Sequence, residues 1–207
     1  MASKKVLSIE IGSRLTRIAE VDYKVKNPKI YRTALLETPE GIMNDGLLKV
    51  TPEFAKELKA KILQSGMKSK QVIFTITSTK IASREIMIPK VKENRIAPLV
   101  AANASDYFPV DLSEYELAHL VLDTVRETVD TEKYKVMVLA VAKSMLESYE
   151  KLAKECGLTI AAIDYSGNSL YQIVKNDCGK GISMVVRIDE GSSMVTILED
   201  GAMLMQR

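Results

Sequence analysis

Two segments that lie far apart in the chain share a pattern that could bind phosphate. Residues 7–13 read LSIEIGS and residues 186–193 read VRIDEGSS, so each apolar run ends in an acid, one further residue, a glycine and a serine. Glycine lets backbone N–H groups approach an anion without an intervening Cβ, and the serine adds a hydroxyl and another N–H. A carboxylate at the end of a strand can orient water bound to Mg²⁺. The repeat therefore predicts two hairpins that close on one polyphosphate.

Either segment alone is a weak signal, because glycine and serine are also ordinary turn residues between strands. The two together favour a phosphate site, because each opens an α/β unit with the same strand-rich continuation. Other kinds of site match poorly. His119 is the only histidine, which argues against a His-rich zinc site or a Ser-His-Asp triad. Cys156 and Cys178 form no metal-spacing motif.

The elements that must position these turns are strands alternating with a few helices. Apolar patterns and turn residues predict strands over 5–11, 15–22, 29–36, 72–76, 81–88, 116–124, 135–142, 158–163, 182–188 and 194–198. Strands 72–76 and 81–88 are expected to form a hairpin, and Asp200-Gly201 predicts another. Thr51 and Pro52 predict the start of a helix that ends at Gly66. Further helices are expected over 94–107, 143–156 and 168–175.

Composition narrows the classes of protein. The chain has 29 basic and 27 acidic residues, a formal charge of +2 and no tryptophan, which argues against a nucleic-acid binder. The longest apolar run, 136–142, falls far short of the ~20 residues that a membrane-spanning helix needs. The apolar stretch after the start is too short and too soon charged for a signal peptide. We therefore expect a cytoplasmic protein with reduced thiols.

The ordered motifs resemble those of the actin/FtsA/heat-shock-chaperone ATPase superfamily. Within it, the chain is similar along essentially its whole length to the PilM family of type IV pilus assembly proteins. The motifs that carry the resemblance are residues 9–13 with Arg17, 84–89 (REIMIP), 106–109 (DYFP), 161–164 (AAID) and 188–193 (IDEGSS). The resemblance implies an α/β fold. An actin-like, ribonuclease H-like first lobe would carry a small inserted α+β subdomain, followed by only the beginning of a second lobe.

The domain boundaries expected from this resemblance divide the chain into four parts. Residues 1–70 form the first part of lobe I, 71–133 the inserted partner-binding subdomain, 134–178 the rest of lobe I with a connecting helix, and 179–207 the start of lobe II. Since the superfamily binds adenosine in its second lobe, we expect the chain to be a truncated part of a longer protein. The newly started sheet would then have an open edge.

The resemblance also implies roles for individual residues in binding ATP and Mg²⁺. Glu10 and Asp189 would hold Mg²⁺ through water, and Asp189 could instead position the attacking water. The phosphate contacts would come from Gly12, Ser13, Arg14, Arg17, Gly191, Ser192 and Ser193. Arg17 can equally be a solvated strand residue. Because Glu10 replaces the commoner aspartate and displaces the carboxylate, we expect at most a slow ATPase in the full-length protein. This chain is expected to be inactive and to bind no nucleotide tightly.

By the same resemblance, the partner is the cytoplasmic tail of a PilN-like inner-membrane protein, held between the first lobe and the insert. The chain would be peripheral to the inner membrane through this partner, alongside other pilus platform proteins, and could self-associate; no nucleic acid is expected. Candidate contact residues are Arg84, Tyr107, Phe108 and Pro109, because arginine and aromatic side chains dominate such interfaces. The alternative for Phe108 and Pro109 is a helix end packed on its own core.

Three other functions stay open at this point. An FtsA-like division protein shares the fold and associates with membranes. A small-molecule kinase of the sugar or acetate kinase group would need a general base, and the middle of the chain has no obvious acid–base pair. The third is a protein-binding module whose phosphate loops no longer bind a nucleotide. The glutamate at position 10, in place of the commoner aspartate, is compatible with this function.

Overall fold

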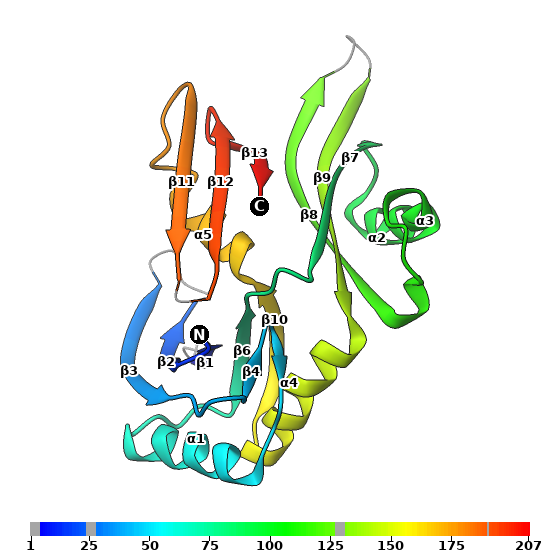
Figure 1. The fold of residues 1–207 in the computed structure, drawn as a ribbon. Helices are drawn as coiled ribbons and strands as arrows, with labels where there is room; N and C mark the ends of the chain where they lie inside the picture. The colour runs from blue at the N-terminus through cyan, green and yellow to red at the C-terminus, as the bar shows by residue number, and fades with distance from the viewer. Residues whose placement is uncertain (1–4, 24–27, 127–130, 190) are drawn as a thin grey trace. The chain divides into compact units, whose positions relative to one another are not determined.

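The structure, a computed structural model, describes residues 5–23, 28–126, 131–189 and 191–207. Contacts within the chain define two compact units, whose strands and helices Figure 1 labels. The first unit takes residues up to 78 together with 145–172 and 188–193; the second takes 79–144, 173–187 and 194–207. Within the described ranges, no helix has the length and apolar composition that a membrane crossing requires.

A five-stranded sheet in the order β10-β6-β1-β2-β3 forms the base of the first unit (Figure 1). Its strands are β1 (Val6–Ile11), β2 (Leu15–Asp22), β3 (Lys29–Glu37), β6 (Gln71–Ile76) and β10 (Thr159–Tyr165). The first three strands form an antiparallel meander, and β6 and β10 continue the sheet in parallel with β1. Leu7, Ile9 and Phe74 are fully buried, because alternate residues of a strand share one face.

The helices of the first unit are α1 (Pro52–Gln64), α4 (Lys143–Cys156) and α5 (Ser166–Val174). The predicted start of α1 is confirmed, since the Thr51 side chain accepts a hydrogen bond from the Phe54 N–H at 3.2 Å. Helix α4 packs on the sheet through Tyr149, whose ring meets Phe74 edge to face with centroids 5.2 Å apart.

A short hairpin that we did not predict lies between β3 and α1. Strands β4 (Met43–Asn44) and β5 (Leu47–Leu48) flank a turn in which Asp45 and Gly46 have φ of 46° and 86°. Asp-Gly is the sequence signal for such a turn and could have revealed it. The Ser78 hydroxyl donates to the Asp45 carbonyl at 2.8 Å, which ties the hairpin to the end of β6.

Replacing Gly46 with alanine is expected to destabilise the protein by about 2–3 kcal/mol, from left-handed strain and a steric clash. A Cβ at this position would lie 2.6 Å from the Ser78 Cβ and 3.1 Å from the Met145 Cε. Gly41→Ala is the control: φ is +78°, but a Cβ there meets no atom within 4 Å, so we expect a loss of about 1 kcal/mol. Urea unfolding measures the loss of unfolding free energy in both variants. Equal losses for Gly46→Ala and Gly41→Ala would contradict the predicted steric clash.

The second unit contains an antiparallel sheet in the order β7-β9-β8. Its elements are β7 (Ala82–Pro89), α2 (Glu93–Ala102), α3 (Ala104–Tyr107), a 3-10 turn (Leu112–Glu114), β8 (Tyr115–Arg126) and β9 (Glu132–Ala142). Its core combines side chains of the sheet with side chains of the helical segment: Ile88, Ile96, Val100, Phe108, Val136, Val138 and Ala140. Burial of this apolar surface is what holds the helices on the sheet.

The structure differs from three expectations, two of them because of long-range strand pairing. Strands 72–76 and 81–88 are not a hairpin, because β6 pairs with β1 while β7 pairs with β9. The inserted subdomain was expected to cover residues 71–133, but the sheets do not follow these limits. Strand β6 belongs to the five-stranded sheet, and β9 belongs to the three-stranded one. The helix expected over 94–107 is two helices, interrupted at Asn103, whose side-chain amide donates to the Leu99 carbonyl at 2.9 Å.

The last sheet has the order β11-β12-β13. Its strands are β11 (Ile182–Ile188), β12 (Ser193–Glu199) and β13 (Ala202–Gln206). The predicted Asp200-Gly201 hairpin is confirmed: both residues have positive φ, and β12 pairs antiparallel with β13. Lys135 of β9 donates from Nζ to the Met203 carbonyl at 2.9 Å, a contact within the second unit.

Candidate functional site

The first predicted phosphate turn joins β1 to β2. The Gly12 N–H donates to the Leu15 carbonyl at 3.0 Å, so this group is engaged inside the turn. A Cβ on Gly12 would lie 2.9 Å from the Leu15 oxygen, which explains why a glycine is required for the turn itself. This observation supports a hairpin role for Gly12. Phosphate contacts by the backbone of Ser13 and Arg14 stay predictions.

A charged pair stands where β1 ends. Arg17 lies directly opposite Glu10 in the β1–β2 register, and its Nη1 is 3.4 Å from the Glu10 Oε2. Both side chains are at least partly exposed, so the pair itself adds little stability. A guanidinium in this position can also bind a phosphate oxygen in a bidentate manner.

Strand register adds Asp164, to which we assigned no role from the sequence. Thr75 of β6 is the neighbour of Glu10 on one side and of Asp164 on the other, so the three share one row and one sheet face. With strands ~4.8 Å apart, the backbones of Glu10 and Asp164 lie ~10 Å apart at the carboxyl ends of parallel strands. Ligands of α/β sheets commonly bind at such ends. The sequence did contain a clue to Asp164, because this acidic residue stands between an apolar run typical of a strand and a predicted helix.

The Asp164 carboxylate also organises the start of α5. It accepts hydrogen bonds from the Tyr165 N–H at 2.9 Å, the Asn168 side-chain amide at 3.0 Å and the Ser169 hydroxyl at 3.0 Å. A carboxylate before a helix satisfies groups at its N-terminus and interacts favourably with its dipole. Asp164 therefore has a structural role that stands whether or not a ligand binds.

Buried hydroxyl groups occur near the same strand ends. In the described part of the chain, no hydrogen-bond partner is found for the Oγ1 of Thr77, which follows β6, or for the Oγ of Ser166, which follows β10. The Tyr149 hydroxyl is in the same situation, and burial, together with the nearby negative charge of Glu10, raises its pKa. Unpaired buried hydroxyls are costly, so ordered water or a polar ligand would stabilise them.

The second predicted turn joins β11 to β12. The Asp189 N–H donates to the Ser192 carbonyl at 2.9 Å, and a Cβ on Gly191 would meet no atom within 4 Å. Glu190 lies outside the described residues. Residues 188–193 fall in the same compact unit as β1, the unit that also holds the first turn. The roles of Asp189, Gly191, Ser192 and Ser193 stay predictions.

Glu10 and Asp189 are the two carboxylates predicted to hold Mg²⁺ through water. Among the described residues, no group of three or more His, Cys, Asp or Glu side chains could hold a metal ion. Mg²⁺ usually keeps several waters and is held by one or two carboxylates together with the phosphates of a nucleotide. Glu10 and Asp189 could supply such carboxylates.

The four candidate partner-binding residues differ in exposure. Arg84 on β7 and Pro109 are exposed, and Tyr107 at the end of α3 is half-buried. Phe108 is only 3% exposed and belongs to the core of the second unit, so the expectation that it is an exposed anchor is wrong. A cavity of about 290 Å³ lies elsewhere in this unit, lined by residues that include Ala97, Ala101, Tyr115, Leu117 and His119.

Comparison with solved structures identifies the fold. The chain resembles a chain of a PilM-PilN type IV pilus biogenesis complex, with a TM-score of 0.81 and 21% identity over 98% of this chain. It also resembles a protein of unknown function with an actin-like ATPase fold from Bacteroides thetaiotaomicron, with a TM-score of 0.50, 12% identity, and 99% of this chain and 69% of that chain covered. The architecture is therefore that of the actin-like ATPases, an α/β fold.

The family follows from the sequence comparison. The family model described as type IV pilus assembly protein PilM matches residues 8–207, and the chain belongs to this family. Membership favours the pilus interpretation over the division-protein and small-molecule-kinase alternatives. The chain spans 60% of the length of the PilM-PilN complex chain that it matches. Comparison with curated proteins gives no match.

Proposed function

We propose that the protein is a cytoplasmic scaffold of the type IV pilus platform that binds the cytoplasmic tail of a PilN-like inner-membrane protein. The observation that carries this proposal is the family match over residues 8–207. It is supported by the fold shared with a chain from a PilM-PilN complex. Membrane association would then come from the partner.

Within this proposal, the tail binds at the second unit, near Arg84 and Tyr107. Arg84 extends from an exposed position on β7, and Tyr107 and Pro109 stand where the helical segment ends. Arginine and tyrosine combine a large contact area with polar groups, which suits peptide recognition. Phe108 supports the site from beneath, by packing in the core.

We also propose that the longer family protein binds ATP with Mg²⁺ at the turns of the first unit. Glu10 would orient metal-bound water, Arg17 would neutralise phosphate charge, and Asp189 would face the metal from the second turn. When bound, the nucleotide would supply a polyphosphate whose negative charge Mg²⁺ and the Arg17 guanidinium would compensate, while the two carboxylates would hold the metal-bound water. Any hydrolysis would be slow because Glu10 carries one methylene more than aspartate, and such displacements are costly in catalysis.

Titration of a labelled synthetic peptide, the cytoplasmic tail of the PilN-like protein from the same organism, tests the proposal by fluorescence anisotropy. We expect saturable binding to this chain, weakened about tenfold or more by Arg84→Ala, as for a contact residue that contributes over 1 kcal/mol.

Lys56→Ala is the matched control, because Lys56 is an exposed cation on α1 in the other unit. Its affinity for the tail should equal that of the unchanged protein. A second control is a peptide that contains the residues of the tail in scrambled order. Equal binding of this peptide, or equal weakening by Lys56→Ala and Arg84→Ala, would contradict the proposed tail site.

A further inference from the structure

The cavity of the second unit meets strand β8 along its edge. The cavity is lined on one side by Ala97, Val100 and Ala101 of α2, and on the other by the consecutive residues 115–119 of β8. Successive side chains of a strand point to opposite faces of the sheet. Because residues of both kinds line the cavity, it is not confined to one face and reaches the edge of the strand.

That edge of β8 is open. The sheet order β7-β9-β8 places β8 last, and β9 pairs with its other edge. In the part of the chain that the structure describes, residues 116–119 make no backbone hydrogen bond outside the β8–β9 ladder. An open edge presents N–H and C=O groups that match the backbone of another strand. We call the cavity and this edge the α2–β8 groove; its residues lie between 97 and 119, inside one compact unit.

The two sides of the α2–β8 groove differ in chemistry. Tyr115 and Leu117 pack against the apolar core that includes Val100 of α2, so the side facing the helix is apolar. On the other side, Glu116 is exposed. Residues 110–119 (VDLSEYELAH) contain three acidic residues and no lysine or arginine, which favours a cation beside Glu116.

We propose that the α2–β8 groove binds an extended segment of another protein, which adds to β8 as a further strand and alternates apolar with basic residues. The apolar side chains would enter the cavity beside α2, and the basic ones would lie next to Glu116. With a volume of about 290 Å³, the cavity is small for a whole ligand and suits side chains. In strand addition, backbone hydrogen bonds supply affinity and pockets for alternate side chains supply specificity.

This groove is separate from the site proposed for the PilN-like tail. Val138 of β9 is the neighbour of Arg84 on one side and of His119 on the other, so Arg84 and β8 stand at opposite edges of the sheet. With strands ~4.8 Å apart, an added strand would lie ~14 Å from the backbone of Arg84. The segment therefore goes beyond the tail contact and belongs to a different protein.

An array of overlapping short peptides is the first test. It covers the cytoplasmic segments of the other pilus proteins of the same organism, without the PilN-like tail; this choice of proteins rests on the proposed function. We expect saturable binding, measured by fluorescence anisotropy, of peptides in which apolar and basic residues alternate. An array without such a peptide would overturn the groove proposal. The tail is titrated separately, so this failure would leave the tail site standing.

Two substitutions locate the bound peptide. Ala101→Phe should weaken binding about tenfold or more by filling the cavity, whereas Ala102→Phe is the control, because Ala102 is exposed on α2 and does not line the cavity. Glu116→Lys should weaken the basic peptide to a similar extent and strengthen a peptide whose basic residues are replaced by glutamate. Such a charge swap excludes misfolding as the cause. Equal effects of Ala101→Phe and Ala102→Phe, or weakening by Arg84→Ala, would overturn the proposal.

Amide hydrogen exchange tests strand addition itself. Binding of the peptide should slow exchange at alternate N–H groups of residues 116–119, since these groups point to the open edge, and should leave α1 of the other unit unaltered. Peptide binding without added protection along β8 would overturn strand addition as the mode of recognition.

Discussion

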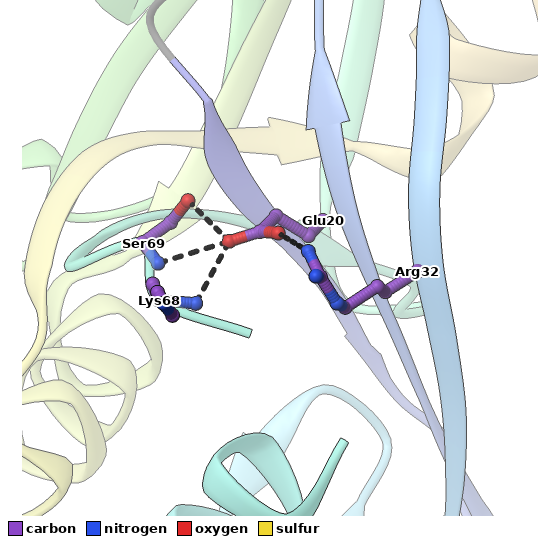
Figure 2. Close-up of polar contacts among 4 residues, drawn as sticks. All are labelled: Glu20, Arg32, Lys68 and Ser69. Carbon is purple, nitrogen blue, oxygen red and sulfur yellow. Dashed lines mark hydrogen bonds and ion pairs between the residues drawn. The ribbon is translucent and has the colours of Figure 1, made fainter. Parts of the chain in front are cut away.

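The Glu20→Gln variant is expected to lose about 3 kcal/mol of unfolding free energy at neutral pH, because one carboxylate holds three parts of the first unit together. Figure 2 shows that Glu20 of β2 lies between Arg32 of β3 and the Lys68–Ser69 segment that leads into β6. Its Oε1 accepts the Lys68 N–H at 2.9 Å, the Ser69 N–H at 3.0 Å and the Ser69 hydroxyl at 2.9 Å. Its Oε2 accepts from the Arg32 Nη1 at 2.9 Å.

The same contacts predict how stability depends on pH. Burial acts to raise the pKa of Glu20, but the hydrogen bonds from Lys68, Ser69 and Arg32 outweigh it and lower the pKa from 4.5 to about 2. The folded state therefore binds fewer protons than the unfolded state between these values. The resulting stabilisation, about 3 kcal/mol, is fully present above pH 4.5 and is lost as the pH falls towards 2.

Urea unfolding at several pH values measures both effects. Glu20→Gln should lower the free energy of unfolding at neutral pH and should reduce its decline in acid, since the titrating group is gone. Glu57→Gln, at an exposed position of α1, is the control and should stay within about 0.5 kcal/mol of the unchanged protein. A Glu20→Gln protein as stable as the control variant would show that the hydrogen bonds contribute no net stability.

Phe108→Ala is expected to lower the free energy of unfolding by about 3–4 kcal/mol, through lost burial and the cavity left behind. The side chain lies among Ile96 and Val100 of α2 and Val136 and Val138 of β9. Removing it therefore weakens the contact between the helical segment and the sheet. Denaturant unfolding of the protein alone measures this change. No binding partner needs to be present, because the loss follows from the position of Phe108 in the core.

Arg84→Ala is the companion variant, since both residues were candidates for partner binding. It should change stability by less than about 0.5 kcal/mol, because Arg84 is exposed, while weakening the tail complex. The two variants thus separate packing from recognition. A Phe108→Ala protein of unchanged stability that fails to bind the tail would restore Phe108 as a contact residue.

Local signals in the sequence predicted much of this protein. Thr51, Pro52 and Gly66 define α1 because capping and glycine conformations act within one turn of the chain. The Asp200-Gly201 hairpin depends in the same way on the backbone freedom of adjacent residues. The ordered motifs identified the PilM family, and with it the actin-like fold, because several short patterns in fixed order are far more specific than any one of them.

Tertiary structure decided what depends on residues distant in the sequence. Strand β6 pairs with β1 and β7 with β9, because pairing partners are chosen by burial across the whole sheet. The same pairing places Asp164 in one row with Thr75 and Glu10. In the sequence, an aromatic residue such as Phe108 at the end of a helix looks the same whether it contacts a partner or packs in the core. Only the tertiary packing distinguishes the two roles. Long-range contacts set burial, and burial determines what each side chain can do.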